Sequence, residues 1–251
     1  MKKPYILITN DDGIQASGIR NLISFLKPMA RLLIVAPDKG HSGQSHAVTV
    51  GEPIRVKLLK EEPDYLEYSC TGTPVDCVKL ALQQICTEKP DLVVSGINHG
   101  NNGGINVLYS GTMGAAFEGT INGCMSIGFS LNSYAHDADF SGCEHSIVKI
   151  VNKALNGDYS KEIALNVNIP AVPDKEINGI NICRQAKGRW VEEFDKRVDP
   201  FGEDYYWLTG EYLADENEKY TDQWALENNF VSIVPQSVDL THYESFHKYN
   251  K

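Results

Sequence analysis

The sequence lacks the signatures of several common kinds of site. Its six cysteines form no Cys-x-x-Cys pair, and none lies beside a spaced pair of histidines, so neither a zinc site nor a thioredoxin-type site is expected. No Gly-Lys-Ser or Gly-Lys-Thr occurs, and no Gly-x-Gly-x-x-Gly follows the first predicted strand. These absences disfavour ATP and dinucleotide sites of the usual types. The Gly-x-Ser-x-Gly elbow of an α/β-hydrolase is also missing.

Long apolar runs and an excess of basic residues are missing too. No segment approaches the roughly 18 apolar residues of a membrane helix, and the N-terminus shows no apolar stretch typical of a signal peptide. With 23 Lys and Arg against 33 Asp and Glu, the formal net charge is −10. This argues against a polymeric nucleic acid as partner, because such binding relies on basic side chains that neutralise phosphates. We therefore expect a cytoplasmic protein with reduced cysteines and no membrane partner.

Strand and helix patterns alternate over roughly the first half of the chain. Apolar runs at 5–8, 32–35 and 91–97 predict buried strands, and apolar spacing over 19–26 predicts a helix between the first two. Residues 47–59 look strand-like and are expected to form a hairpin. A strand, helix and strand in succession imply a parallel sheet with a right-handed crossover. The pattern predicts an α/β fold with a doubly wound, mostly parallel sheet.

The character of the sequence changes beyond Ala186. Charged and aromatic residues dominate up to residue 225, and no helical stripe is evident there. Exposed aromatic side chains on a segment without its own core are typical of an interface, although a hairpin packed on its own domain is the alternative. The expected divisions of a single domain, 1–251, are a core of residues 1–185 and 226–240, an arm of residues 186–225, and a tail of residues 241–251.

Oxygen-bearing side chains follow three of the predicted strands. Asp11 and Asp12 come directly after the first strand, and such adjacent carboxylates repel each other unless a cation is near. Ser42 follows the second strand and Asn98 the strand at 91–97. Because parallel strands end at the same edge of a sheet, we expect these side chains to meet. Such oxygens are hard ligands that suit Mg²⁺ or Mn²⁺. A solvated Asp-Asp-Gly turn is the simpler alternative.

The segment Asn98–Gly111 is rich in glycine and asparagine. Its glycines allow backbone amides to approach a ligand closely. Ser110, Gly111 and Thr112 lie at a predicted helix start, where unpaired amides favour an anion. We therefore expect a phosphate cradle, with ordinary tight turns as the alternative. Three histidines in the same loops are candidates for contact with a substrate: His41, His46 and His99.

Several segments, in their order along the chain, match one known pattern. They are Asn10-Asp11-Asp12-Gly13, Val35-Ala36-Pro37-Asp38 with Ser42-Gly43, Gly72-Thr73-Pro74-Val75-Asp76, Ser95-Gly96-Ile97-Asn98 and Tyr109-Ser110-Gly111-Thr112. Together they resemble the SurE-type survival-protein family of metal-dependent phosphatases, which act as 5′/3′-nucleotidases. The resemblance implies a Rossmann-like sheet with a C-terminal extended arm used in oligomerisation. It therefore favours a homodimer or homotetramer.

The resemblance also implies roles for individual residues. The ligands of one divalent metal cation, Mg²⁺ or Mn²⁺, would be Asp11, Asp12, Ser42 and Asn98. The residues at the substrate phosphate would be Asn98, Asn102, Ser110, Gly111 and Thr112. The catalytic residues would be Asp11, Asp12 and Asn102. One departure from the family pattern is Asn106, where many members carry Asp, and this alters the local charge.

The activity that this resemblance implies is hydrolysis of nucleoside 5′- and 3′-monophosphates to nucleoside and phosphate, through a metal-activated water. A phospho-aspartyl mechanism with Asp11 as nucleophile is a rival. It is disfavoured because haloacid-dehalogenase-like enzymes use Asp-x-Asp-x-Thr, whereas the aspartates here are adjacent. A non-catalytic, metal-dependent nucleotide or phosphate sensor would use the same ligands, and only turnover separates it from an enzyme.

Overall fold

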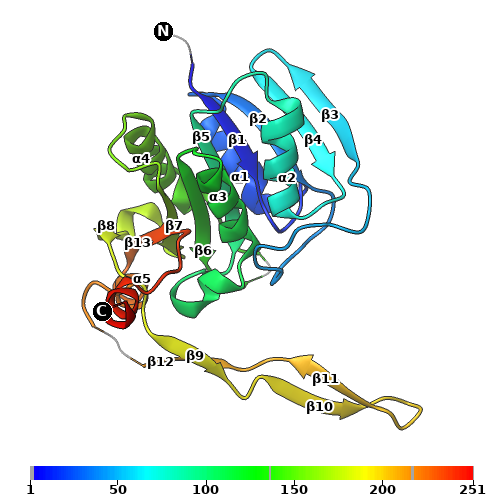
Figure 1. Cartoon of the computed structure of the whole chain (residues 1–251), viewed down its shortest axis with the longest axis vertical. Coiled ribbons are helices and arrows are strands. Elements are labelled where there is room, and N and C mark those ends of the chain that lie inside the picture. The colour runs from blue at the N-terminus through cyan, green and yellow to red at the C-terminus, as the bar shows by residue number, and fades with distance from the viewer. Residues whose placement is uncertain (1–2, 136, 216–217, 251) are drawn as a thin grey trace.

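A nine-stranded sheet forms the centre of the protein (Figure 1). We describe it from a computed structural model that covers residues 3–135, 137–215 and 218–250. The strands lie in the order β3-β4-β2-β1-β5-β6-β7-β13-β8. Their bounds are β1 (Tyr5–Thr9), β2 (Arg31–Pro37), β3 (Val56–Glu62), β4 (Tyr65–Cys70), β5 (Leu92–His99), β6 (Ser126–Asn132), β7 (Ile163–Pro170), β8 (Gly179–Ile182) and β13 (Phe230–Ser237). The six strands from β4 to β7 pair in parallel, whereas β3 runs antiparallel to β4 and β13 antiparallel to β7.

Helices cover both faces of this sheet (Figure 1). Those of the body are α1 (Ser17–Leu26), α2 (Pro74–Leu80), α3 (Gly111–Ile121), α4 (Glu144–Leu155) and α5 (Asp222–Glu227). One core contains Leu22 of α1 and Ile147 of α4, and a second contains Val78 of α2 and Ala115 of α3. A parallel sheet covered in this way buries both sides of its strands, which is why β1 and β2 each contain a continuous apolar run. The predicted α/β class with a mostly parallel sheet is confirmed.

The strand pair expected over residues 47–59 is wrong in its first part, because β3 begins only at Val56. The backbone before it bonds to the start of α2 instead. The N–H of Thr49 donates to the carboxylate of Asp76 at 3.1 Å, and the hydroxyl of Thr73 donates to the carbonyl of Ala47 at 2.7 Å. Polar groups at a helix start thus compete with strand pairing for this segment.

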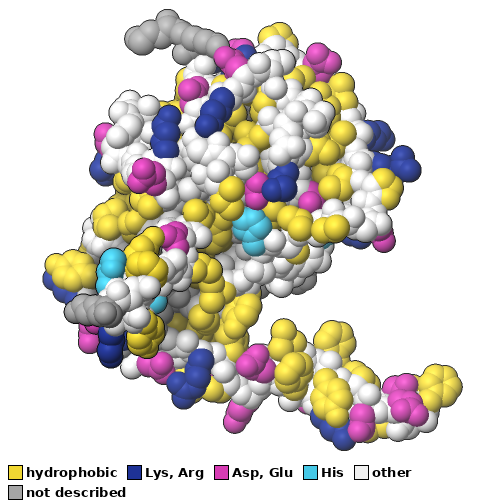
Figure 2. Space-filling view, viewed as in Figure 1, with side chains coloured by type: hydrophobic (Ala, Val, Ile, Leu, Met, Phe, Trp, Pro, Cys, Tyr) yellow, Lys and Arg dark blue, Asp and Glu magenta, His cyan; other side chains and the backbone are white. Residues whose placement is uncertain are grey.

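A long two-stranded ribbon projects from the body between β8 and α5 (Figure 1). Its strands are β9 (Gly188–Val191), β10 (Phe194–Val198), β11 (Asp204–Leu208) and β12 (Glu211–Ala214), with β9 paired to β12 and β10 to β11. Apolar side chains gather along it in Figure 2, and Phe194, Phe201 and Leu208 are each at least two-thirds exposed. The ribbon has no second layer that could bury these side chains.

The chain returns to the body after the ribbon. Ala225 and Leu226 of α5 are buried, so the end of the segment expected as an arm, 186–225, packs on the core. The segment expected as a polar tail holds one further helix, α6 (Tyr243–Tyr249), with no buried side chain. Within the described parts of the chain, no helix has both the length and the apolar composition needed to cross a bilayer.

Candidate active site

The carboxyl ends of β1, β2 and β5 surround one cleft of about 560 Å³. Asp11, Ser42 and Asn98 all line it, as their positions after neighbouring strands predict. Asn98 belongs to the last two residues of β5, because this strand extends to His99. The cleft is in the usual size range for small-molecule sites, about 300–1,000 Å³. The three loops singled out from the sequence therefore converge.

Backbone hydrogen bonds fix the three loops to one another. The N–H of His41 donates to the carbonyl of Asp11 at 2.7 Å, which joins the first loop to the second. The N–H of His99 donates to the Oδ2 atom of Asp12 at 3.1 Å, which joins the first loop to the end of β5. Asp12 is half-buried and is not among the residues that line the cleft. One of its carboxylate oxygens thus already has a backbone partner.

Asp11 is a carboxyl group whose pKa is raised by its surroundings. Its side chain is buried, and burial together with the neighbouring Asp12 carboxylate raises the pKa of Asp11 to about 6, although hydrogen bonds from Thr112 oppose this. Burial also raises the pKa of Asp12. A Cβ at Gly111 would lie 2.9 Å from the Cβ of Asp11, so the missing side chain lets α3 begin against this carboxylate. A nearby cation would relieve the strain on both charges.

The donor atoms fit a hard divalent cation. The side-chain nitrogen of Asn98 donates to the carbonyl of Gly100 at 2.6 Å, which leaves the amide oxygen as the available ligand. Among the described residues, no three His, Cys, Asp or Glu side chains gather into a metal-binding group. A cation here would therefore take oxygens from Ser42 and Asn98 in addition to the two carboxylates, a set suited to Mg²⁺ or Mn²⁺.

Residues at the start of α3 hold the Asp11 carboxylate in place. The hydroxyl of Thr112 is fully buried and donates to the Oδ1 atom of Asp11. Ser110 caps the helix, accepting from the N–H of Met113 at 3.0 Å, and it lines the cleft. Gly111 and Thr112 do not line it. Thr112 thus orients Asp11, and contact of Ser110, Gly111 and Thr112 with a phosphate stays a prediction.

Asn102 lines the cleft and is held by a buried polar ladder. Its N–H donates to the Oδ1 atom of Asn168 at 2.7 Å, and its carbonyl accepts from Asn166 at 2.8 Å. Its side-chain nitrogen donates to the hydroxyl of Ser130 at 2.9 Å. These three partners were not predicted from the sequence. The available signal was a pair of carboxamides at alternate positions of an apolar strand, which face the same way and must find partners when buried.

A second buried anchor, also missed, is Asp222 at the start of α5. Its Oδ2 atom accepts from the N–H of Gly104 at 2.8 Å, and its Oδ1 atom accepts from the N–H of Ala186 at 2.8 Å. One carboxylate therefore ties the loop that follows Asn98 to the root of the ribbon. A buried, hydrogen-bonded carboxylate of this kind is a strong local constraint.

Aromatic and apolar side chains form the outer wall of the cleft. Tyr109 and Tyr134 come from the body, whereas Trp190 and Leu208 come from the ribbon. The indole N–H of Trp190 donates to the Oδ1 atom of Asn106 at 2.8 Å, so the ribbon is bonded to the wall it completes. The sequence marked this segment as an interface, and its contribution to the cleft was not predicted.

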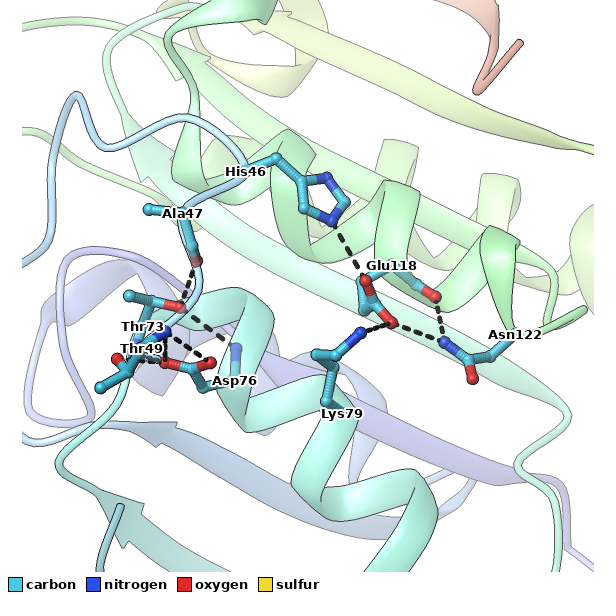
Figure 3. Close-up of polar contacts among 8 residues, drawn as sticks. All are labelled: His46, Ala47, Thr49, Thr73, Asp76, Lys79, Glu118 and Asn122. Atoms are coloured by element: carbon cyan, nitrogen blue, oxygen red, sulfur yellow. Dashed lines mark hydrogen bonds and ion pairs between the residues drawn. The ribbon is translucent and has the colours of Figure 1, made fainter. Parts of the chain in front are cut away.

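The three candidate histidines take different positions. His99 lines the cleft. His41 is buried, with its Nδ1 atom 2.9 Å from the side-chain oxygen of Gln44. His46 is not among the lining residues and instead faces Glu118 of α3 (Figure 3). Only one of the three is therefore placed to meet a ligand in this cleft.

Known proteins share both the sequence and the fold of this chain. The sequence model of the family described as Survival protein SurE matches residues 6–192. The chain is 49% identical over 250 residues to a protein named 5′-nucleotidase SurE from Flavobacterium johnsoniae, covering 99% of this chain and 96% of that protein. A protein of the same name from Christiangramia forsetii is 50% identical over 242 residues, covering 96% and 93%. The crystal structure of the SurE protein from Aquifex aeolicus is similar with a TM-score of 0.85, at 40% identity and 98% coverage of both chains. By sequence and by structure, the chain belongs to the SurE survival-protein family.

Proposed function

We propose that the protein is a metal-dependent phosphomonoesterase that hydrolyses nucleoside 5′- and 3′-monophosphates to nucleoside and phosphate. The names of its relatives, 5′-nucleotidase SurE, support a nucleotide as substrate. The observation that carries the proposal is the buried carboxylate of Asp11, adjacent to Asp12 and set against the start of α3 in a partly aromatic cleft. Such a site offers a place for a cation, a phosphate and a nucleoside side by side.

In this proposal Asp11, Asp12, Ser42 and Asn98 hold one Mg²⁺ or Mn²⁺. The cation would lower the pKa of a bound water and offset charge on the phosphoryl oxygens. The chain supplies positioning: Thr112 holds Asp11 in place with its buried hydroxyl. Positioned groups cost no reorganisation when charge develops on the phosphoryl group.

The phosphate side of the proposed site relies on groups that are fixed in advance. Asn102 is bonded through its backbone and its side chain to β6 and β7, and Ser110 is fixed as the cap of α3. We propose that both donate to the phosphate, together with the residues that follow Ser110. Their donors then meet the phosphate without a change in the loop.

The position of Trp190 in the outer wall of the cleft allows the proposed nucleoside position to be tested. Base stacking on an aromatic side chain contributes about 1–3 kcal/mol, so we expect Trp190→Ala to lower kcat/KM for nucleoside monophosphates by roughly 10- to 100-fold. Hydrolysis of β-glycerophosphate, which has no ring, should change little. Steady-state kinetics with both substrates measure the difference.

Trp207→Ala is the matched control for this experiment. Trp207 lies on the same ribbon, is 58% exposed and is not a lining residue of the cleft. It should leave both substrates unaffected. An equal loss with β-glycerophosphate in Trp190→Ala would show that the indole supports the site and does not contact the nucleoside.

The experiment that tests the activity is phosphate release from 5′- and 3′-nucleoside monophosphates and p-nitrophenyl phosphate. Protein treated with a chelator should release only background phosphate, and added Mn²⁺ or Mg²⁺ should restore the release. Tight nucleotide binding without release, in the presence of either cation, would contradict the enzyme and favour a sensor. Phosphate trapped covalently on the protein would instead favour Asp11 as nucleophile.

We further propose that the ribbon is the oligomerisation arm of a homodimer or homotetramer. Large apolar side chains on it stand exposed, among them Phe201 at 90% and Leu208 at 70%. Apolar patches of this kind on a soluble domain mark interaction sites. The proposed partner is a second copy of the chain.

A further inference from the structure

The segment that carries Ser42 is anchored on its side remote from the cleft. We call residues 41–50 the Ser42 loop. Residues 42–45 of this loop are all exposed, so the position of the Ser42 hydroxyl depends on what holds the residues on either side. On the N-terminal side the holding contact is the bond from the N–H of His41 to Asp11. On the C-terminal side the contacts lead to α3 and α2 (Figure 3).

On the C-terminal side, Glu118 of α3 contacts the loop through His46. The side chain of Glu118 is only 4% exposed, and its Oε2 atom lies 3.1 Å from the Nε2 atom of His46. Its Oε1 atom accepts from Lys79 of α2 at 2.9 Å and from Asn122 at 2.7 Å. Burial alone would raise the pKa of Glu118, and these three partners outweigh it and lower the pKa. Glu118 is thus a buried carboxylate, fully partnered, outside the cleft.

Close packing reinforces this contact. A Cβ at Gly114 of α3 would lie 2.7 Å from the carbonyl oxygen of Ser45 and 3.1 Å from the Cα of His46, so the loop backbone rests directly on the helix. The hydroxyl of Ser45 donates to the carbonyl of Leu108 at 2.6 Å, and its N–H donates to the carbonyl of Tyr109 at 3.0 Å. The loop is therefore seated on the same helix whose first turn supports Asp11.

The C-terminal end of the Ser42 loop is held by a different carboxylate, that of Asp76. The roles of Asp76 and Glu118 can therefore be told apart. Asp76 accepts from the hydroxyl of Thr49 at 2.6 Å and also from the N–H of Thr73 at 2.9 Å (Figure 3). Asp76 thus serves the cap of α2 and holds the loop seven residues after Ser42. Glu118 caps no helix, and its loop partner, His46, is only four residues after Ser42.

We propose that Glu118 is a positioning residue for the metal centre. Through its contact with His46, Glu118 holds the loop so that the Ser42 hydroxyl lies at the ligand position. This rests on the proposed function, in which Ser42 is a ligand. The carboxylate touches neither substrate nor cation, so its contribution is geometric. Groups that orient metal ligands in this way typically change metal affinity or activity by about 10–100-fold when removed.

The test is a double-mutant cycle of Mn²⁺ affinity, measured by calorimetry on protein stripped of metal. We expect Glu118→Ala and Ser42→Ala each to weaken Mn²⁺ binding by about 10-fold. The double variant should bind no more weakly than Ser42→Ala alone, because Glu118 acts only through Ser42. Glu118→Gln, which keeps the size of the side chain, should lose less than Glu118→Ala and serves as the folded variant if the alanine destabilises the chain.

Glu144→Ala is the matched control, because it makes the same substitution at an exposed position, the first residue of α4. It should bind Mn²⁺ as the wild type does. A second readout needs no metal: hydrogen exchange at the amide of Ser45, which is bonded to Tyr109, should be faster in Glu118→Ala than in Glu144→Ala.

The outcomes separate this proposal from the proposed function. If the wild type binds no Mn²⁺, the metal centre itself is wrong and both proposals fall. If the wild type binds Mn²⁺ and both Glu118 variants bind it equally well, only the positioning role is overturned. Independent, additive losses in the double variant, or unchanged exchange at Ser45, also overturn it, because Glu118 would then act by a route other than the loop.

Discussion

Asp11→Asn is expected to lower the kcat of phosphate release by about 10²–10³-fold, while the chain stays folded. The substitution keeps the shape of the side chain and an oxygen that accepts the hydroxyl of Thr112. It removes the negative charge that would bind the proposed cation, and removal of one stabilising group at a reacting centre typically costs about 10²–10³-fold. Kinetics at saturating Mn²⁺ and circular dichroism of the same samples check both parts of the expectation.

Asp158→Asn is the control for this variant, because it makes the same change of charge at an exposed position after α4. It should retain full activity. Substantial turnover by Asp11→Asn with saturating metal would contradict the role of Asp11 as ligand and would leave Asp12 to carry the site.

The same Asp11→Asn variant is expected to be more stable than the wild type in the absence of metal at neutral pH. The pKa of Asp11 is raised from 3.8 to about 6 in the folded state by burial and by Asp12. Between these two values the folded chain binds more protons than the unfolded chain, so stability falls as the pH rises through this window. Above pH 6 the loss is complete, at about 3 kcal/mol.

Urea unfolding in a chelating buffer tests this at two pH values. At pH 7.5 the variant should exceed the wild type by about 3 kcal/mol, or roughly 6–12 °C in Tm. Near pH 3.5 the difference should nearly vanish, because the carboxyl is then largely protonated in both states. Added Mn²⁺ should stabilise the wild type and leave the variant unchanged. A difference that is the same at both pH values would show that the charge of Asp11 is not the cause.

The parts of the fold that the sequence predicted well are those in which local pattern and burial coincide. β1 is buried along its whole length and contains the apolar run 5–8, because both faces of a parallel sheet are covered. The start of α2 is likewise determined locally, by Thr73, Pro74 and Asp76, since a capping box depends only on residues three apart. The cleft residues Asp11, Ser42 and Asn98 could be grouped for a similar reason. Each lies at the carboxyl end of a strand of one parallel sheet or in the loop that follows it.

The supports of the site escaped prediction because they join residues far apart in the chain. Asn102 and Asn168 are 66 residues apart, and Gly104 and Asp222 are 118 apart. A periodic pattern within one segment of the sequence does not indicate which distant residue will be its hydrogen-bond partner. The segment before β3 failed for the opposite reason, because its strand-like residues bond to the start of α2. Local propensity gives way where a tertiary partner offers the backbone a better hydrogen bond.

The two amides that meet on Asp222 have a mechanical consequence. The ribbon is tied to the body at its root, because Ala186 and Gly104 of the glycine-rich loop donate to the same buried carboxylate. The hydrogen bond from Trp190 of β9 to Asn106 is a second link between the ribbon and the wall of the cleft. Bending of the ribbon would therefore move the wall of the cleft, and a partner bound at the outer end of the ribbon would restrain the place where a nucleotide is proposed to lie.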